Sequence, residues 1–86
     1  MNLLEVKDLF SEIVDNCPEL EGVHFMIVPS IAVHSIVEGY EIHMSGKKLD
    51  DTTLVFLRDL SNKYGLYYEN KDGAVGIFKI NKAILK

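Results

Sequence analysis

Apolar residues near the start of the chain recur at helical spacing. One side of a helix over residues 3–17 would carry Leu3, Val6, Leu9, Phe10, Ile13, Val14 and Cys17. Acids at spacings of three, four and three share another side, and they are Glu5, Asp8, Glu12 and Asp15. Pro18 disfavours helical geometry in the residue before it, so the helix should end near Asn16 or Cys17. The pattern therefore predicts an amphipathic helix with a core face and an acidic face.

Strand-like patterns follow this helix. Val23 to Val28 is rich in β-branched and aromatic residues, and Pro29 ends the segment, which is typical of a strand. Tyr40 to Ser45 alternates apolar and polar side chains, as a half-buried antiparallel strand does. Ile31 to Val37 fits either a strand or a short helix that ends before Gly39, and we favour the strand.

A second helix is predicted to begin at Asp50 or Asp51 and to end at Gly65. A carboxylate at its start can cap free amide groups, and Lys63 places a cation in its last turn. Its predicted core stripe consists of Thr53, Phe56, Leu57, Leu60 and Tyr64.

The last pattern is a β-hairpin around the segment Asn70 to Gly73. Asn suits the first position of a type I turn, and Gly73 suits the left-handed bulge position that follows such a turn. This turn pairs Tyr67 with Ile77. It directs one set of side chains toward the helices, namely Leu66, Tyr68, Phe78 and Ile80. It leaves a second set facing solvent, namely Tyr67, Val75 and Ile77.

The order of these elements predicts one α+β domain spanning residues 1–86. We expect a two-layer sandwich of αβ(β)βαββ order, in which two helices cover one face of an antiparallel sheet. The other face of the sheet then stays open, and it is the surface on which we expect function.

Composition agrees with a single domain, since 86 residues of which 48% are hydrophobic suffice for one core. The one cysteine, Cys17, cannot form an internal disulfide, and the start of the chain lacks the pattern of a signal peptide. We therefore expect a cytoplasmic protein. The most apolar stretch, Phe25 to Val33, is far shorter than the roughly 20 residues needed to span a bilayer, so no membrane partner is expected.

Charge is distributed unevenly along the chain. Residues 1–45 hold eight acids and one base, net −7, whereas residues 46–86 hold eight bases and five acids, net +3. We expect the two halves to face each other within one fold. The alternative is head-to-tail self-association, or two partners of opposite charge.

Nucleic-acid binding is disfavoured by the sequence. The net charge is −4, so phosphate attraction would need a local patch of lysines. Residues 73–80 have the length of an RNA-recognition strand, but Val75 and Ile77 occupy the positions where stacking aromatics belong.

Catalytic and metal signatures are also absent from the sequence. His24, His34 and His43 have spacings of ten and nine residues, which match no metal motif. His24 and His43 can still meet across strands, where Glu41 or Cys17 can join them. The sequence has no glycine-rich phosphate loop and no nucleophile motif, so we expect a non-enzymatic protein without a cofactor.

No motif assigns the chain to a family. The sequence predicts an interaction or structural module that forms a homodimer or docks a protein partner through its open sheet face. The candidate contact residues are Tyr67, Val75, Ile77, Glu5, Asp8, Glu12 and Asp15. The alternative is a domain that binds a small ligand, a metal or nucleic acid.

Overall fold

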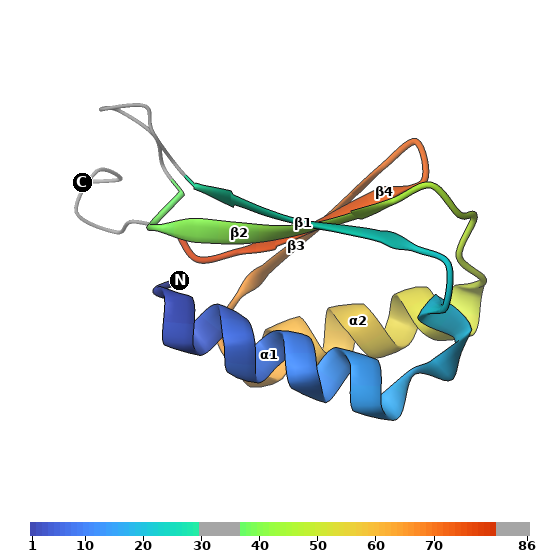
Figure 1. The fold of residues 1–86 in the computed structure, drawn as a ribbon, viewed down its shortest axis with the longest axis horizontal. Coiled ribbons are helices and arrows are strands. Elements are labelled where there is room, and N and C mark those ends of the chain that lie inside the picture. The colour runs from blue at the N-terminus through green and yellow to red at the C-terminus, as the bar shows by residue number, and fades with distance from the viewer. Residues whose placement is uncertain (30–36, 81–86) are drawn as a thin grey trace.

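The structure, a computed structural model, describes residues 1–29 and 37–80. This part of the chain forms two helices, a short 3-10 turn and four strands (Figure 1). They are α1 (Leu3–Asn16), η1 (Pro18–Leu20), β1 (His24–Pro29), β2 (Tyr40–Ser45), α2 (Asp51–Lys63), β3 (Tyr67–Lys71) and β4 (Ala74–Phe78). The predicted α+β class and element order are confirmed. The predicted strand at Ile31 to Val37 lies outside the described residues, except for Val37, which forms an isolated bridge with Ile80.

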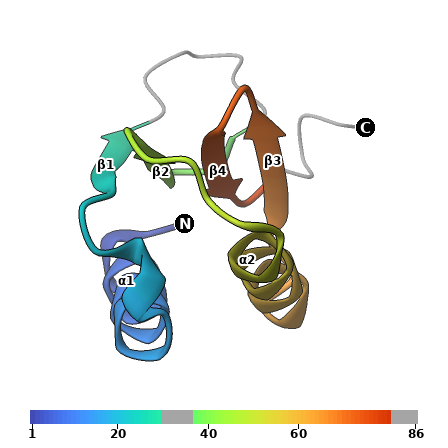
Figure 2. The ribbon, with the colours of Figure 1, turned by 90° about the vertical axis from the view of Figure 1, so that its right-hand side faces the viewer.

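The strands form one antiparallel sheet in the order β1-β2-β4-β3. Both helices lie on the same face of this sheet, and no helix of residues 1–29 and 37–80 lies on the opposite face (Figures 1 and 2). The predicted two-layer arrangement with two helices on one face is therefore confirmed.

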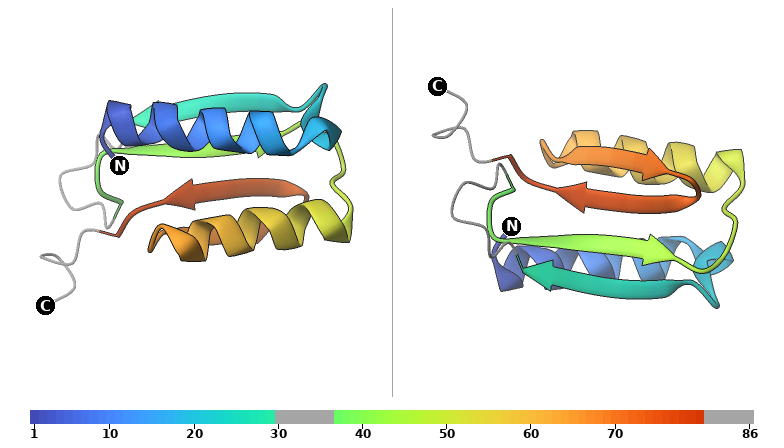
Figure 3. Two further views of the ribbon diagram at one scale, coloured as in Figure 1. Left: turned by 90° about the horizontal axis from the view of Figure 1, so that it is seen from below. Right: turned by 90° about the horizontal axis from the view of Figure 1, so that it is seen from above.

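The two halves of the chain lie side by side in this sheet. The first half contributes α1, β1 and β2, and the second contributes α2, β3 and β4. Seen from above and below, each helix runs along its own half (Figure 3). The halves meet where β2 pairs with β4, through Ile42 opposite Ile77 and Met44 opposite Val75. Each half therefore places its first strand at an edge of the sheet and its second strand at the centre.

Polar side chains cap the N-terminal ends of both helices. Asn2 and Glu5 form a reciprocal capping box at the start of α1, with bonds of 2.8 and 3.0 Å. Asp50 accepts a hydrogen bond of 2.8 Å from the backbone N–H of Thr53 at the start of α2. The predicted cap at Asp50 and the predicted end of α1 near Asn16 are confirmed.

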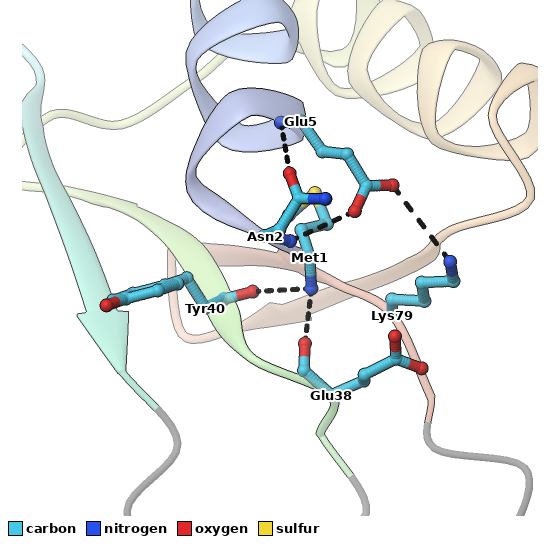
Figure 4. Close-up of polar contacts among 6 residues, drawn as sticks. All are labelled: Met1, Asn2, Glu5, Glu38, Tyr40 and Lys79. Atoms are coloured by element: carbon cyan, nitrogen blue, oxygen red, sulfur yellow. Dashed lines mark hydrogen bonds and ion pairs between the residues drawn. The ribbon is translucent and has the colours of Figure 1, made fainter.

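The first residue ties α1 to the sheet, as Figure 4 shows. The amino group of Met1 donates hydrogen bonds to the carbonyl oxygens of Glu38 and Tyr40, and the N–H of Tyr40 donates back to the Met1 carbonyl over 2.7 Å. Burial lowers the pKa of this amino group below its ordinary value. Gly39 has a positive φ of 68° and passes against the Met1 backbone, where a Cβ atom would collide.

The core lies between the helices and the sheet. Its most buried side chains include Val6, Ile13, Ile42, Met44, Leu57, Val75 and Ile77. Three residues of the predicted helical core faces are instead exposed: Leu3 by 58%, Val14 by 44% and Tyr64 by 50%. The helices rest on the sheet along a narrower strip than the apolar pattern predicted.

The predicted register of the final hairpin is wrong by one residue. The turn is the two-residue loop Asp72-Gly73, and both residues have positive φ, 51° and 85°. Such a turn matches the right-handed twist of its strands. It pairs Tyr67 with Phe78 instead of with Ile77. Because successive side chains alternate between faces, this shift moves every side chain of β4 to the opposite side of the sheet.

Val75 and Ile77 are consequently core residues. Their exposed fractions are 1% and 0%, so the prediction that they face solvent is wrong. Tyr67 is 51% exposed, as predicted, and its neighbour on the uncovered face is Phe78.

Substitution of one residue from each face of the hairpin tests this register. We expect Ile77→Ala to lower the free energy of unfolding by about 2–5 kcal/mol, because it leaves a cavity in the core. Tyr67→Ala should cost about 1 kcal/mol, mainly through loss of its contact with Phe78. Urea unfolding measures both. Equal, small losses would contradict the observed register.

Candidate functional site

The candidate site is the sheet face that the helices leave uncovered. Directly paired residues of antiparallel strands share a face, so the register identifies its members. The central row across the sheet consists of Met26, His43, Gly76 and Glu69. A second row includes Val28 opposite Glu41 and Phe78 opposite Tyr67. The buried neighbours of these residues along β2 and β4 point to the helices instead.

An aromatic pair forms the most apolar feature of this face. The rings of Tyr67 and Phe78 stack with centroids 6.0 Å apart and an angle of 14° between their planes. On β1, Met26 is 57% exposed, and Val28 is half-buried. The sheet face thus carries apolar side chains on both of its edge strands and on β4, although neither α1 nor α2 covers them.

A histidine and a glutamate lie between these apolar groups. His43 Nε2 is 3.1 Å from Glu41 Oε1, and both side chains project from β2 on the uncovered face. Gly76 is paired with His43, and a Cβ atom there would lie 3.7 Å from His43 Nε2, so the imidazole ring lies close to the glycine. A carboxylate next to a histidine can fix the orientation of the ring, which then offers a hydrogen-bonding group to a bound molecule.

His24 and His43, which were predicted to meet across strands, are not directly paired. His24 is paired with Ser45, whereas His43 is paired with Met26, so the two histidines lie one row apart on the same face. His34 lies outside the described residues. In residues 1–29 and 37–80 no group of three His, Cys, Asp or Glu side chains is placed to hold a metal ion.

Cys17 is remote from this face. It is 5% exposed in the core on the helix side, and its thiol donates to Glu19 Oε2 at 3.4 Å. Burial and the neighbouring carboxylate raise the pKa of the Cys17 thiol above its ordinary value. The suggestion that Cys17 joins the histidines is therefore wrong.

The acidic stripe of α1 lies on a different surface. Glu12 accepts a hydrogen bond from the hydroxyl of Tyr64, and its carboxylate is 3.5 Å from Lys63 Nζ. Glu5 belongs to the capping box and is 4.0 Å from Lys79 Nζ (Figure 4). These contacts direct one side of the stripe toward the second half of the chain. Sequence spacing predicted the stripe but could not reveal that Glu5 and Glu12 have structural partners.

A hollow of about 240 Å³ lies beside the stripe. It is lined by Met1, Glu5, Asp8, Leu9, Tyr64 and Leu66. Its volume is below the roughly 300–1,000 Å³ typical of ligand pockets. No pattern in the sequence predicted this hollow, because its walls come from both halves of the chain.

The uncovered face carries little positive charge. Lys71 is 2.9 Å from Glu69, so its charge is largely compensated, and Glu41 adds a further carboxylate. Lys47 does not join Lys71 on this face, since it donates to the backbone carbonyls of Glu19 and Glu21. Lys79 lies near Glu5.

Comparisons of the chain with protein-family models, curated proteins and solved structures find no match. Within the described residues, neither helix combines the length and apolar character required to cross a membrane.

The contact between Tyr64 and Glu12 gives a test of the acidic stripe. The Tyr64 hydrogen bond is the main cause that lowers the pKa of Glu12 below its ordinary value of 4.5. We expect Tyr64→Phe to raise this pKa, which an NMR titration of the Glu12 carboxyl carbon measures directly. An unchanged Glu12 pKa in the variant would contradict the contact.

The same contact predicts a change in acid stability. A carboxyl group with a lowered pKa stabilises the fold above its unfolded pKa, and this contribution disappears as the pH falls through the folded value. Wild-type protein should therefore lose more stability than Tyr64→Phe when the pH falls below about 4.5. Urea unfolding at neutral and acid pH measures the difference.

Proposed function

We propose that the protein is a non-enzymatic interaction module that docks a protein partner on the uncovered face of its sheet. The observation that supports this proposal is the stacked pair of Tyr67 and Phe78, which lies on the face that α1 and α2 leave uncovered. Aromatic side chains supply large contact areas and are enriched in protein interfaces. Burial of such a surface against a partner gains about 25 cal/mol per Å² before the costs of association.

The polar groups of this face support recognition of a protein. His43 and Glu41 form a fixed polar pair between the apolar residues of β1 and the aromatic pair. Interfaces between proteins combine apolar contact with hydrogen-bonding groups of this kind, and the polar groups set orientation and partner choice. We expect the partner to place a hydrogen-bonding group opposite His43.

Nucleic acid is a weaker candidate partner for this face. Aromatic rings on a sheet can stack with bases, and Tyr67 and Phe78 are aromatic. However, these rings already stack on each other, and the face carries Glu41 and Glu69 against Lys71. A phosphate backbone would meet no excess of positive charge there.

Cytoplasmic location is part of the proposal. Cys17 is a free, buried thiol, and such cysteines are typical of proteins in reducing compartments.

Exchange of one aromatic residue tests the proposed docking face. Tyr67→Lys removes the exposed ring and adds a charge, whereas Val55→Lys adds the same charge on α2, where Val55 is 44% exposed. We expect a protein that co-purifies from the native source with the wild type to bind Tyr67→Lys at least about 10-fold more weakly, a loss of roughly 1.4 kcal/mol. Val55→Lys should bind it normally.

Titration of the purified pair by calorimetry gives the affinities, and circular dichroism checks that both variants are folded. Equal affinity of wild type and Tyr67→Lys would refute docking on this face. Co-purified nucleic acid that Tyr67→Lys fails to retain would favour the alternative class of partner.

A further inference from the structure

The two edges of the sheet differ in a way that points to a second contact surface. An edge strand exposes unpaired backbone N–H and C=O groups, and proteins commonly protect such edges with charged side chains. The edge strand β3 carries Glu69 and Lys71. The other edge strand, β1, has the sequence HFMIVP and carries no acidic residue, lysine or arginine. The β1 edge therefore lacks the charged protection that β3 has.

The side chains of β1 are also unusually exposed for a strand of this composition. Ile27 is 48% exposed, although it is paired with the fully buried Ile42 and therefore points to the helix side of the sheet. α1 contacts β2 more closely than β1, and Ile27 lies on the edge strand of the sheet, so its side chain stays partly accessible.

One side of α1 continues this apolar margin. Phe10 contacts Phe25 of β1 edge to face, with ring centroids 4.9 Å apart and an interplanar angle of 87°. This contact fixes which side of α1 lies next to β1. Leu3 and Val14, seven residues before and four after Phe10, share that side of the helix and are 58% and 44% exposed. We call the set Leu3, Phe10, Val14, Phe25 and Ile27 the β1 flank.

We propose that the β1 flank binds a second copy of this chain, with β1 paired antiparallel to β1 of the other copy. A two-fold axis perpendicular to the sheet produces this pairing and keeps the helices of both copies on one side. The Leu3 and Val14 sides of the two α1 helices then approach each other. The interaction is self-complementary, because each copy supplies both a strand edge that no other described strand pairs with and an apolar helix side.

The position of charge favours a second copy over a basic partner. The acidic stripe is on the other side of α1, where Glu12 reaches Lys63 of α2. A helix with its side chains is about 10–12 Å wide, so each stripe stays more than a Debye length of about 8 Å from the opposing helix. Lys7 is the charged residue on the flank side of α1, and a lysine can pack its stem while its ammonium group remains in water.

Salt dependence distinguishes this dimer from a charge-driven complex. Residues 1–45 carry a net charge of −7, so two copies that meet through α1 and β1 repel each other at long range. Salt added below about 0.15 M screens this repulsion, and we expect it to tighten the dimer. A complex held by attraction between the acidic half and a basic surface would instead weaken in salt.

Sedimentation equilibrium of the full chain tests the proposal between about 1 µM and 1 mM, the range in which small interfaces associate. We expect a monomer–dimer equilibrium in the wild type. Ile27→Lys and Val14→Lys should each raise the dissociation constant at least about 10-fold, because each places a charge in the interface. Matched controls are Leu4→Lys, on the outer side of α1 with 66% exposure, and Val55→Lys on α2. Both controls should dimerise as the wild type does.

Circular dichroism establishes which variants fold, and if Ile27→Lys is unfolded, Val14→Lys decides the question. A wild type that stays monomeric throughout the range overturns the proposal, as does a dimer that Val14→Lys leaves intact. A dimer that salt weakens also overturns it. A dimer lost in Tyr67→Lys but not in Val14→Lys would transfer self-association to the uncovered sheet face. The dimer proposal does not rest on partner docking, so either can fail alone.

Discussion

The pairing of β2 with β4 is the contact on which the rest of the fold depends. It joins two αββ halves, neither of which could bury both its helix and its strands alone, since a two-stranded hairpin is marginal in water. Ile42 opposite Ile77 and Met44 opposite Val75 put four nearly inaccessible side chains at the centre of the sheet. Both helices lie on the same face because these apolar side chains project from only that face.

Local patterns in the sequence were sufficient to predict most elements of the fold. The alternation from Tyr40 to Ser45 and the cap at Asp50 depend on neighbours within one strand or one helical turn, so they can be read without tertiary information. The predicted register of the hairpin was wrong because two turns were possible, and the strand registers that they produce differ by one residue. Asp72-Gly73 is itself a strong two-residue turn signal, and assigning the turn to the longer Asn70 to Gly73 segment inverted the facing of β4.

Periodicity also could not show how much of each apolar stripe would be covered. Leu3 and Val14 fit the core side of α1 by spacing, but the sheet contacts only the part of that side centred on Val6, Leu9 and Ile13. The width of a helix–sheet contact depends on where the helix rests across the strands, which is a tertiary property. The exposure of the β1 flank therefore could not be predicted from the sequence, although every residue in it belongs to a predicted element.

Correction of the hairpin changes the argument about nucleic acid without reversing it. In the predicted register Val75 and Ile77 occupy the stacking positions, whereas in the structure Phe78 and Tyr67 lie on that face. The objection based on missing aromatics is thus removed. The electrostatic objection is stronger, since Glu41 and Glu69 project from the same face. Among the described strand residues, Lys71 is the one lysine on that face, and it is paired with Glu69. Charge, rather than ring content, decides against a phosphate-bearing partner.

Dimerisation through the β1 flank would bring the uncovered sheet faces of two copies together into one larger docking surface. A two-fold axis perpendicular to the sheet keeps the uncovered faces of both copies on one side, so Tyr67 and Phe78 of each copy would be presented in the same direction. A partner with two matching segments would then bind the second face as an intramolecular step, at the effective concentration set by the distance between its segments. Weak contacts on a small sheet face can give useful affinity in this way. An 86-residue domain has limited surface for any single interface, and pairing two copies along β1 enlarges the docking face without enlarging the fold.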